Sequence, residues 1–221
     1  MANSLKKRPI SLPLVLNGCI SSLVLALGFS PTLGAFTASI SGDMNSAGAG
    51  TVVMQERDSS GTITCLSTDG GGLSVNAASC SAMNRYGGDL GMRPGDSAVI
   101  VTYIRNVGTV AASSFSLTPG VCVQSAAGAL PGSAADFCSK IAVSITSDLT
   151  TIFDGTAATL GSVGAIDVLS RLGLARVQPG LQITFTVTTT MDPTVDNSYQ
   201  GLKVSQPMTW TFSAQPMTPK P

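Results

Sequence analysis

The chain has 221 residues, of which 11% are charged and 43% hydrophobic, and its formal net charge is zero. It contains no histidine, so the commonest general base and the commonest transition-metal ligand are both missing. Without the basic residues at 6–8 the chain is mildly acidic, which argues against a nucleic-acid partner.

Residues 1–35 are predicted to be an export signal. Basic residues at 6–8 precede an apolar stretch at 10–29, and small residues then lead to Ala35. This order is typical of a secretory signal peptide, so we predict cleavage between Ala35 and Phe36. The mature protein is then secreted, to the cell surface or the extracellular matrix.

Other interpretations of the leader are weaker. Cleavage after Gly34 is the second choice. An uncleaved membrane anchor is disfavoured because Pro13, Asn17 and Gly18 interrupt the apolar stretch. A lipid anchor at Cys19 is disfavoured because the apolar stretch continues beyond that cysteine.

The predicted mature chain opens with alternating apolar and polar residues. Phe36, Ala38 and Ile40 fall on one side of a strand over 36–41, and threonine and serine fall on the other. Residues 42–50 follow as a loop of small residues, which gives this strand a flexible tether. A tethered terminal strand can pair with its own sheet or with the open edge of a neighbour, and both possibilities stay open.

The rest of the mature chain predicts many short strands and almost no helix. The two longest, at 98–104 and 181–190, each follow a Pro-Gly turn, and the second has apolar residues at alternate positions. Two such strands are predicted to form the centre of the fold. Shorter strands are predicted at 51–56, 62–66, 115–118, 141–146, 151–155 and 204–212. The sequence permits one helical turn near Phe137, and 161–176 is ambiguous because Gly164 and Gly173 weaken the helical turn that its apolar spacing permits.

The strand pattern is typical of an all-β fold, and we predict an antiparallel β-sandwich of jelly-roll type with few short helical turns. One domain is expected over 36–214, followed by a Pro-rich disordered tail at 215–221. A mature chain of this size is long enough to bury a hydrophobic core.

Four cysteines follow the predicted signal peptide: Cys65, Cys80, Cys122 and Cys138. An even number behind an export signal predicts two disulfides, and three pairings are possible. We favour Cys65–Cys80 with Cys122–Cys138, because each bridge then closes one irregular loop beside a strand. A metal or redox site is the alternative, but the chain has no Cys-x-x-Cys and no histidine to complete a zinc shell.

The sequence offers little catalytic or cofactor chemistry. Serine and threonine hydroxyls lack an activating base, and no Ser-x-x-Lys or phosphate-binding loop is present. Asp192, Asp196 and Asn197 could supply oxygens to a calcium ion, but their spacing is not that of an EF-hand. An Asx-rich loop is the simpler interpretation, so we expect no enzyme, no cofactor and no bound metal.

Several short motifs together resemble one family. They are Ala-Phe-Thr-Ala at 35–38, Arg-Pro-Gly-Asp at 93–96 with Asn-Val-Gly-Thr at 106–109, and Asn-Ser-Tyr-Gln-Gly at 197–201 before Trp-Thr-Phe at 210–212. The chain resembles the TasA/camelysin family of Gram-positive bacteria, in the branch exported through a SipW-like signal peptidase. The resemblance implies a jelly-roll subunit of biofilm-matrix fibres, which polymerises alone or with an accessory matrix protein. The metalloprotease activity claimed for camelysins is not expected, because His-Glu-x-x-His is absent.

Three functions stay open. The first is an exported structural subunit that polymerises with itself by donating the strand at 36–41. The second is a cell-envelope adhesin for carbohydrate or a partner protein; Arg85 and Tyr86 could stack on a sugar, although such a pair is usually ordinary surface. An exported hydrolase has the least support, because the acid–base inventory is so small. Fold alone does not separate the first two functions.

Overall fold

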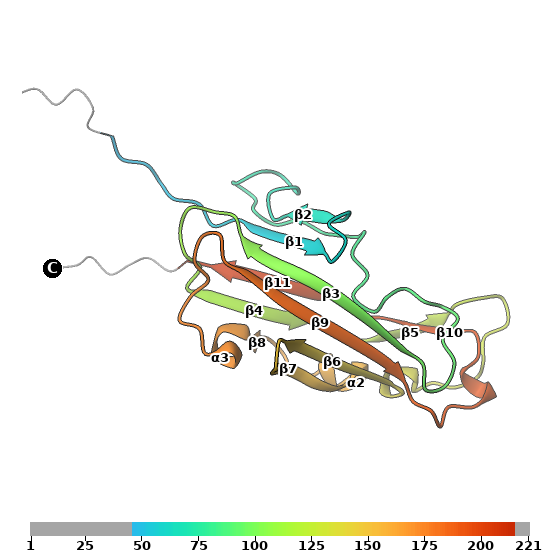
Figure 1. Ribbon diagram of the computed structural model, residues 1–221. Coiled ribbons are helices and arrows are strands. Elements are labelled where there is room, and N and C mark those ends of the chain that lie inside the picture. Colours follow the sequence, from blue (N-terminus) through green and yellow to red (C-terminus); the bar gives the residue numbers. More distant parts are fainter. Residues whose placement is uncertain (1–45, 215–221) are drawn as a thin grey trace, which may run out of the picture. The chain divides into compact units, whose positions relative to one another are not determined.

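The computed structural model describes residues 46–214 of the chain (Figure 1). Outside the described residues lie the predicted signal peptide at 1–35 with its cleavage site at Ala35 and Phe36, the predicted donor strand with Phe36, Ala38 and Ile40, and the predicted tail at 215–221. From Gly48 onward the described chain forms one compact unit.

The largest sheet has six antiparallel strands, in the order β2-β1-β3-β9-β6-β7. Its central pair, β3 with β9, consists of the two longest strands that the sequence predicts, and the pairing runs from Ser97 opposite Thr190 to Arg105 opposite Gln182. Their β-branched and aromatic side chains suit a pleated surface. The strands of this sheet are β1 (Met54–Asp58), β2 (Thr64–Leu66), β3 (Ser97–Asn106), β6 (Ile141–Ser147), β7 (Thr150–Thr156) and β9 (Gln182–Met191).

Two smaller antiparallel sheets complete the fold. One has the order β11-β4-β8 and the other pairs β10 with β5, a strand that is not among the predicted ones. Their strands are β4 (Ser114–Pro119), β5 (Val123–Ala126), β8 (Ile166–Asp167), β10 (Leu202–Ser205) and β11 (Met208–Ser213).

The predicted strand at 204–212 is wrong as a single element, because the chain forms two strands there. β10 ends at Ser205 and β11 begins at Met208, in different sheets. Pro207 lacks an N–H group and so interrupts the ladder. The side-chain amide of Gln206 donates to the main-chain carbonyls of Gly120 and Ala157, at 2.8 and 3.0 Å, which holds the break in place.

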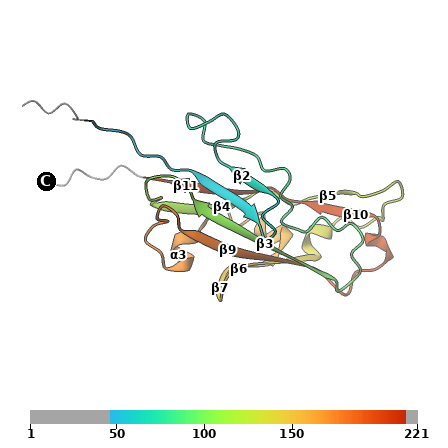
Figure 2. The same cartoon turned by 45° about the horizontal axis from the view of Figure 1, so that its top comes forward.

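The core lies between the six-stranded sheet and the β11-β4-β8 sheet (Figures 1 and 2). Ile183, Phe185 and Val187 on β9 are buried at alternate positions, as their spacing predicts. The ring of Phe185 packs against Trp210 of β11 and Phe115 of β4, with ring centroids 4.6 and 5.8 Å apart. The structure therefore confirms a mostly β protein built from antiparallel sheets.

Helices are few and short, as predicted. They are α2 (Ala157–Leu160), α3 (Val168–Leu172) and the single turns η1 (Phe137–Ser139) and η2 (Asn197–Tyr199). α2 is not among the predicted elements; a reciprocal cap between Thr156 and Thr159 starts it. None of the helices among residues 46–214 is long and apolar enough to span a bilayer.

Two disulfides are present, Cys65–Cys80 and Cys122–Cys138, which is the pairing that the sequence favours. The first joins β2 to the connection that follows it, and the second joins the residue before β5 to η1. Two disulfides are typical of a protein from an oxidising compartment, in agreement with the predicted export.

The connection between β2 and β3, residues 67–96, contains no helix or strand. Met83 is the one buried residue in this stretch. Gly87 and Gly88 have φ values of 85° and 75°, a conformation that glycine adopts without steric cost. Connections of this length without secondary structure are usually either functional or linkers. This connection starts and ends at one sheet, because β2 and β3 on its two sides both belong to the six-stranded sheet.

Candidate functional site

β10 and β11 each have one edge without a strand partner in the described structure. Among the described residues β11 pairs only with β4, and β10 only with β5. Because β4 leads towards β5 while β10 leads towards β11, the two pairs follow one another, with β4 and β5 as one line of partner strands and β11 and β10 as the other. Such an edge offers main-chain N–H and C=O groups to another strand.

Two cavities lie along these free edges. The first, about 620 Å³ in volume, extends beside β10 and is also lined by β9, η2 and the 67–96 connection. The second, about 550 Å³, extends beside β11 and is also lined by β1, β2 and the same connection. Both volumes fall within the usual range of binding pockets. The hydrophobic lining includes Leu90, Phe137, Met191 and Tyr199 in the first cavity, and Val52, Met54, Trp210 and Phe212 in the second.

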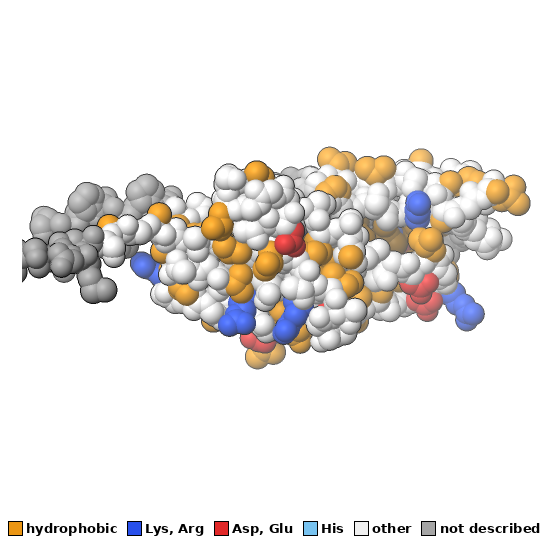
Figure 3. Space-filling view, turned by 90° about the horizontal axis from the view of Figure 1, so that it is seen from above, with side chains coloured by type: hydrophobic (Ala, Val, Ile, Leu, Met, Phe, Trp, Pro, Cys, Tyr) orange, Lys and Arg blue, Asp and Glu red, His pale blue; other side chains and the backbone are white. Residues whose placement is uncertain are grey.

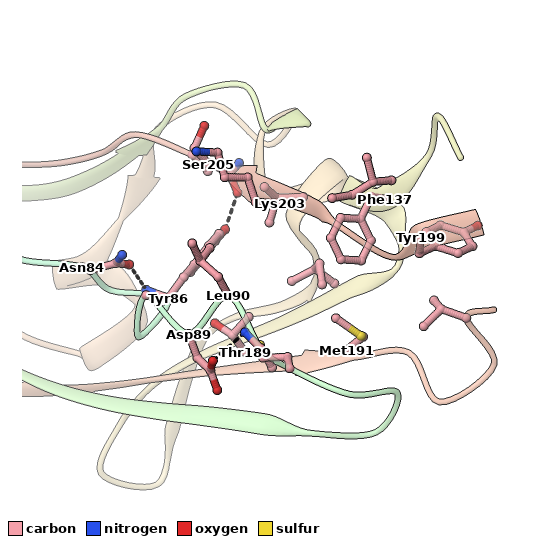
Figure 4. A pocket seen from close by; sticks show the side chains of 18 of the residues that line it. Asn84, Tyr86, Asp89, Leu90, Phe137, Thr189, Met191, Tyr199, Lys203 and Ser205 are labelled. Atoms are coloured by element: carbon pink, nitrogen blue, oxygen red, sulfur yellow. Dashed lines mark hydrogen bonds between the residues drawn. The ribbon is translucent and has the colours of Figure 1, made fainter. Parts of the chain in front are cut away.

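The first cavity lies between β9 and β10. Figure 4 shows Thr189 on β9 opposite Lys203 and Ser205 on β10. The phenol of Tyr86 donates a hydrogen bond to the side-chain oxygen of Gln206. Burial raises the pKa of Tyr86, so the phenol stays protonated at neutral pH and keeps this hydrogen bond. The 67–96 connection is therefore tied to the turn between β10 and β11.

Each cavity has one buried polar atom without a hydrogen-bond partner in the described structure. In the first cavity it is the hydroxyl of Thr189, and in the second it is the indole N–H of Trp210. Both residues are more than nine-tenths buried. An unsatisfied buried polar group costs about 1–3 kcal/mol.

A buried ion pair lies between the cavities. The guanidinium of Arg85 donates from Nε to Oε1 of Glu56 at 2.9 Å and from Nη2 to Oε2 at 2.5 Å. Glu56 is on β1 with only 7% of its surface exposed, and the hydroxyl of Thr102 also donates to it at 3.3 Å. The remaining nitrogen, Nη1, donates to the main-chain carbonyl of Met208 at 3.3 Å. One side chain thus connects the six-stranded sheet with the free edge of β11.

The three calcium candidates lie in one turn after β9, and their oxygens accept local hydrogen bonds. Asp192 accepts from the main chain and hydroxyl of Thr194 at 2.8 and 2.7 Å, and from Lys140 at 3.2 Å. Asp196 caps η2, and Asn197 accepts from a nearby glutamine. Within 46–214 no three or more cysteine or acidic residues gather as a metal site.

The described surface combines hydrophobic and uncharged side chains with a few charged ones (Figure 3). The space-filling view from above shows hydrophobic and uncharged side chains over most of the visible face, with a few basic and acidic ones between them (Figure 3). Leu90, which lines the first cavity, is 67% exposed. Such a surface favours contact with another protein over contact with a polyanion.

The sequence does not single out Glu56 or Thr189, and it treats Arg85 as ordinary surface. The sequence does contain a pattern that could have identified Thr189. It is the next inward-facing residue on β9 after Val187, and it is polar where the preceding inward residues are apolar. Glu56 and Arg85 are 29 residues apart in the chain, so no local pattern joins them.

Comparison with protein-family models gives no match for this chain, and comparison with curated proteins gives no relative.

Proposed function

We propose that this protein is an exported structural subunit that polymerises into cell-surface or biofilm-matrix fibres. Residues 36–41 of one copy add to the free edge of β11 in the next copy, on a fold of jelly-roll type. The observation that carries the proposal is the line of free strand edge with hydrophobic cavities along it. The resemblance of the sequence motifs to the TasA/camelysin family points to the same function.

The predicted donor strand has the chemistry that the groove needs. Its main chain would pair with the N–H and C=O groups at the free edge, and Phe36, Ala38 and Ile40 would point into the cavities. Burying Phe36 and Ile40 contributes roughly 3–6 kcal/mol before the cost of ordering the strand. The polar alternate residues would face solvent.

The contact joins two different surfaces, so it propagates. A donor strand on one copy and an acceptor groove on the next form a head-to-tail interface that does not close, which gives a filament. The small-residue tether at 42–50 allows the strand to leave its own domain. Until a SipW-like signal peptidase cuts after Ala35, the leader keeps the strand from entering a groove; an accessory matrix protein is a further proposed partner.

An alternative is a cell-envelope binding module on the same fold. The observation that favours it is the first cavity, whose lining includes the rings of Tyr86, Phe137 and Tyr199 beside several polar side chains. Aromatic and polar groups together suit a carbohydrate. We assign the chain no catalytic role.

The test of polymerisation is electron microscopy of the purified mature chain and three variants. Deletion of 36–41 and the double substitution Phe36→Asp with Ile40→Asp should both give folded monomers without filaments. Thr37→Asp with Ser39→Asp is the matched control, because it adds the same charge on the solvent side of the strand, and filaments should persist.

Normal filaments from both the deletion and the inward-facing aspartate variant would refute strand donation. Unfolding of both variants would assign the strand to its own core instead. Persistent wild-type monomers that bind a glycan array would support the binding-module alternative.

A further inference from the structure

Part of the 67–96 connection divides the groove in two. Met83 and Arg85 line both cavities, as do Gln206 and Met208 on the opposite side. Without the side chains of this segment, the two cavities would form one continuous groove along β10 and β11. We name residues 81–88 the latch.

The latch covers a main-chain acceptor that a donated strand needs. The N–H of Gly120 donates to the carbonyl of Pro207, which fixes the alternation of the β4–β11 ladder. Successive residues of a strand direct their main-chain groups to opposite sides, so the carbonyl of Met208 faces the free edge. Arg85 already donates to that carbonyl. A cation at a sheet edge also discourages pairing with another chain.

The latch is held by polar contacts and by limited apolar packing, since Met83 is buried and Tyr86 packs against the core. Its polar attachments include the ion pair of Arg85 with Glu56, the hydrogen bond from Arg85 to the carbonyl of Met208 and the phenol hydrogen bond of Tyr86. The latch can swing about its two ends while the sheets stay folded. Cys80, directly before it, is tethered to β2 by a disulfide, and glycines with positive φ end it. Segments with little buried apolar surface open most easily.

We propose that the latch is an autoinhibitory gate over the acceptor groove, which the incoming strand of a second copy displaces. This inference rests on the proposed function, since it assumes that the groove accepts residues 36–41. Glu56 keeps the gate closed, because withdrawal of Arg85 leaves a buried carboxylate without its cation. The closed monomer therefore predominates, and free subunits do not pair through β11 before a donor arrives.

The gate predicts a kinetic signature. A donor strand binds only the open form, so the observed association rate equals the intrinsic rate multiplied by the open fraction. Weakening the latch raises that fraction and the association rate. Dissociation starts from the open, occupied groove, where the latch makes no contact, so its rate stays constant.

The test uses a fluorescent synthetic peptide of residues 36–45 and, as acceptor, the mature chain with Phe36→Asp and Ile40→Asp. Stopped-flow anisotropy gives the association rate and the dissociation rate of the peptide. Glu56→Gln with Arg85→Gln removes both charges together and leaves no unpaired buried ion. We expect association at least about tenfold faster, with dissociation unchanged.

The matched control is Lys140→Gln with Asp192→Asn. It removes the ion pair with a 3.2 Å separation, whose residues line neither cavity, and association should stay as in the parent acceptor. Should the latch variant fail to fold by circular dichroism, Tyr86→Phe replaces it, because it removes only the phenol contact to Gln206. A smaller increase in association rate is then expected.

The two proposals fail differently. Equal association rates in the parent and in the folded latch variant would overturn the gate and leave strand donation intact. A peptide that binds no acceptor at any concentration would overturn strand donation and the gate with it.

Discussion

At the residue scale, buried polar side chains divide into those that hold the fold and those that mark the groove. Asn106, fully buried at the end of β3, donates to the carbonyls of Val110 and Val177 at 2.9 and 3.0 Å and accepts from the N–H of Gly108 at 3.0 Å. Thr189 has no such partner for its hydroxyl in the described structure. A satisfied buried amide specifies one conformation, whereas an unsatisfied buried hydroxyl lowers the stability of the fold.

The carboxylate of Asp192 makes the free energy of unfolding depend on pH. The hydroxyl and main-chain hydrogen bonds of Thr194, followed by the contact with Lys140, lower the pKa of Asp192 to about 2. A depressed folded-state pKa means that the carboxylate stabilises the fold above its unfolded pKa of about 4, and that this contribution is lost as pH falls to about 2. We expect Asp192→Asn to lower the melting temperature near pH 6, and we expect this difference to shrink as pH falls through about 2.

The measurement is a series of thermal melts of the folded chain between pH 2 and pH 6. Asp148→Asn is the control, since it removes a carboxylate in the turn between β6 and β7. A difference between wild type and Asp192→Asn that stays constant over the whole pH range would contradict this account.

At the element scale, the disulfides fix the ends of irregular segments. Cys65–Cys80 closes a loop of 15 residues' separation and Cys122–Cys138 one of 16. In the chain-entropy model, loops of that size each contribute about 3 kcal/mol by restricting the unfolded chain. Replacing Cys122 and Cys138 together by serine should lower the free energy of unfolding in guanidinium by about that amount.

The Cys65→Ser with Cys80→Ser variant serves as the comparison, because the model predicts a nearly equal loss for it. Thiol labelling of the denatured, non-reduced mature protein should find no free thiol. A labelled cysteine in that sample would show that at least one bridge is absent from the secreted protein.

At the scale of the whole molecule, the predicted processing and the proposed assembly depend on the same short segment. The predicted cut after Ala35 releases Phe36 as the first residue, so the donor strand becomes free at the moment of processing. Intact mass of secreted protein should therefore correspond to a chain that starts at Phe36, or at Ala35 if the cut follows Gly34. Recovery of the full-length chain from membranes alone would contradict this.

Much of the fold follows from the sequence alone. Three features can be read from the sequence without knowing which distant residues pair. They are the alternation of Ile183, Phe185 and Val187, the turn residues before both long strands, and the even number of cysteines. They therefore predict strands, a buried face and loop-closing disulfides without knowledge of the tertiary structure.

Other features were decided only by the tertiary structure. The sequence at 204–212 reads as one alternating strand, but Pro207 and the anchoring of Gln206 to Gly120 and Ala157 divide it between two sheets. Sequence spacing likewise gives no reason to join Glu56 with Arg85, or either with Met208. These contacts arise because packing brings distant segments to one free edge, and a pairing between distant residues leaves no period or spacing in the chain.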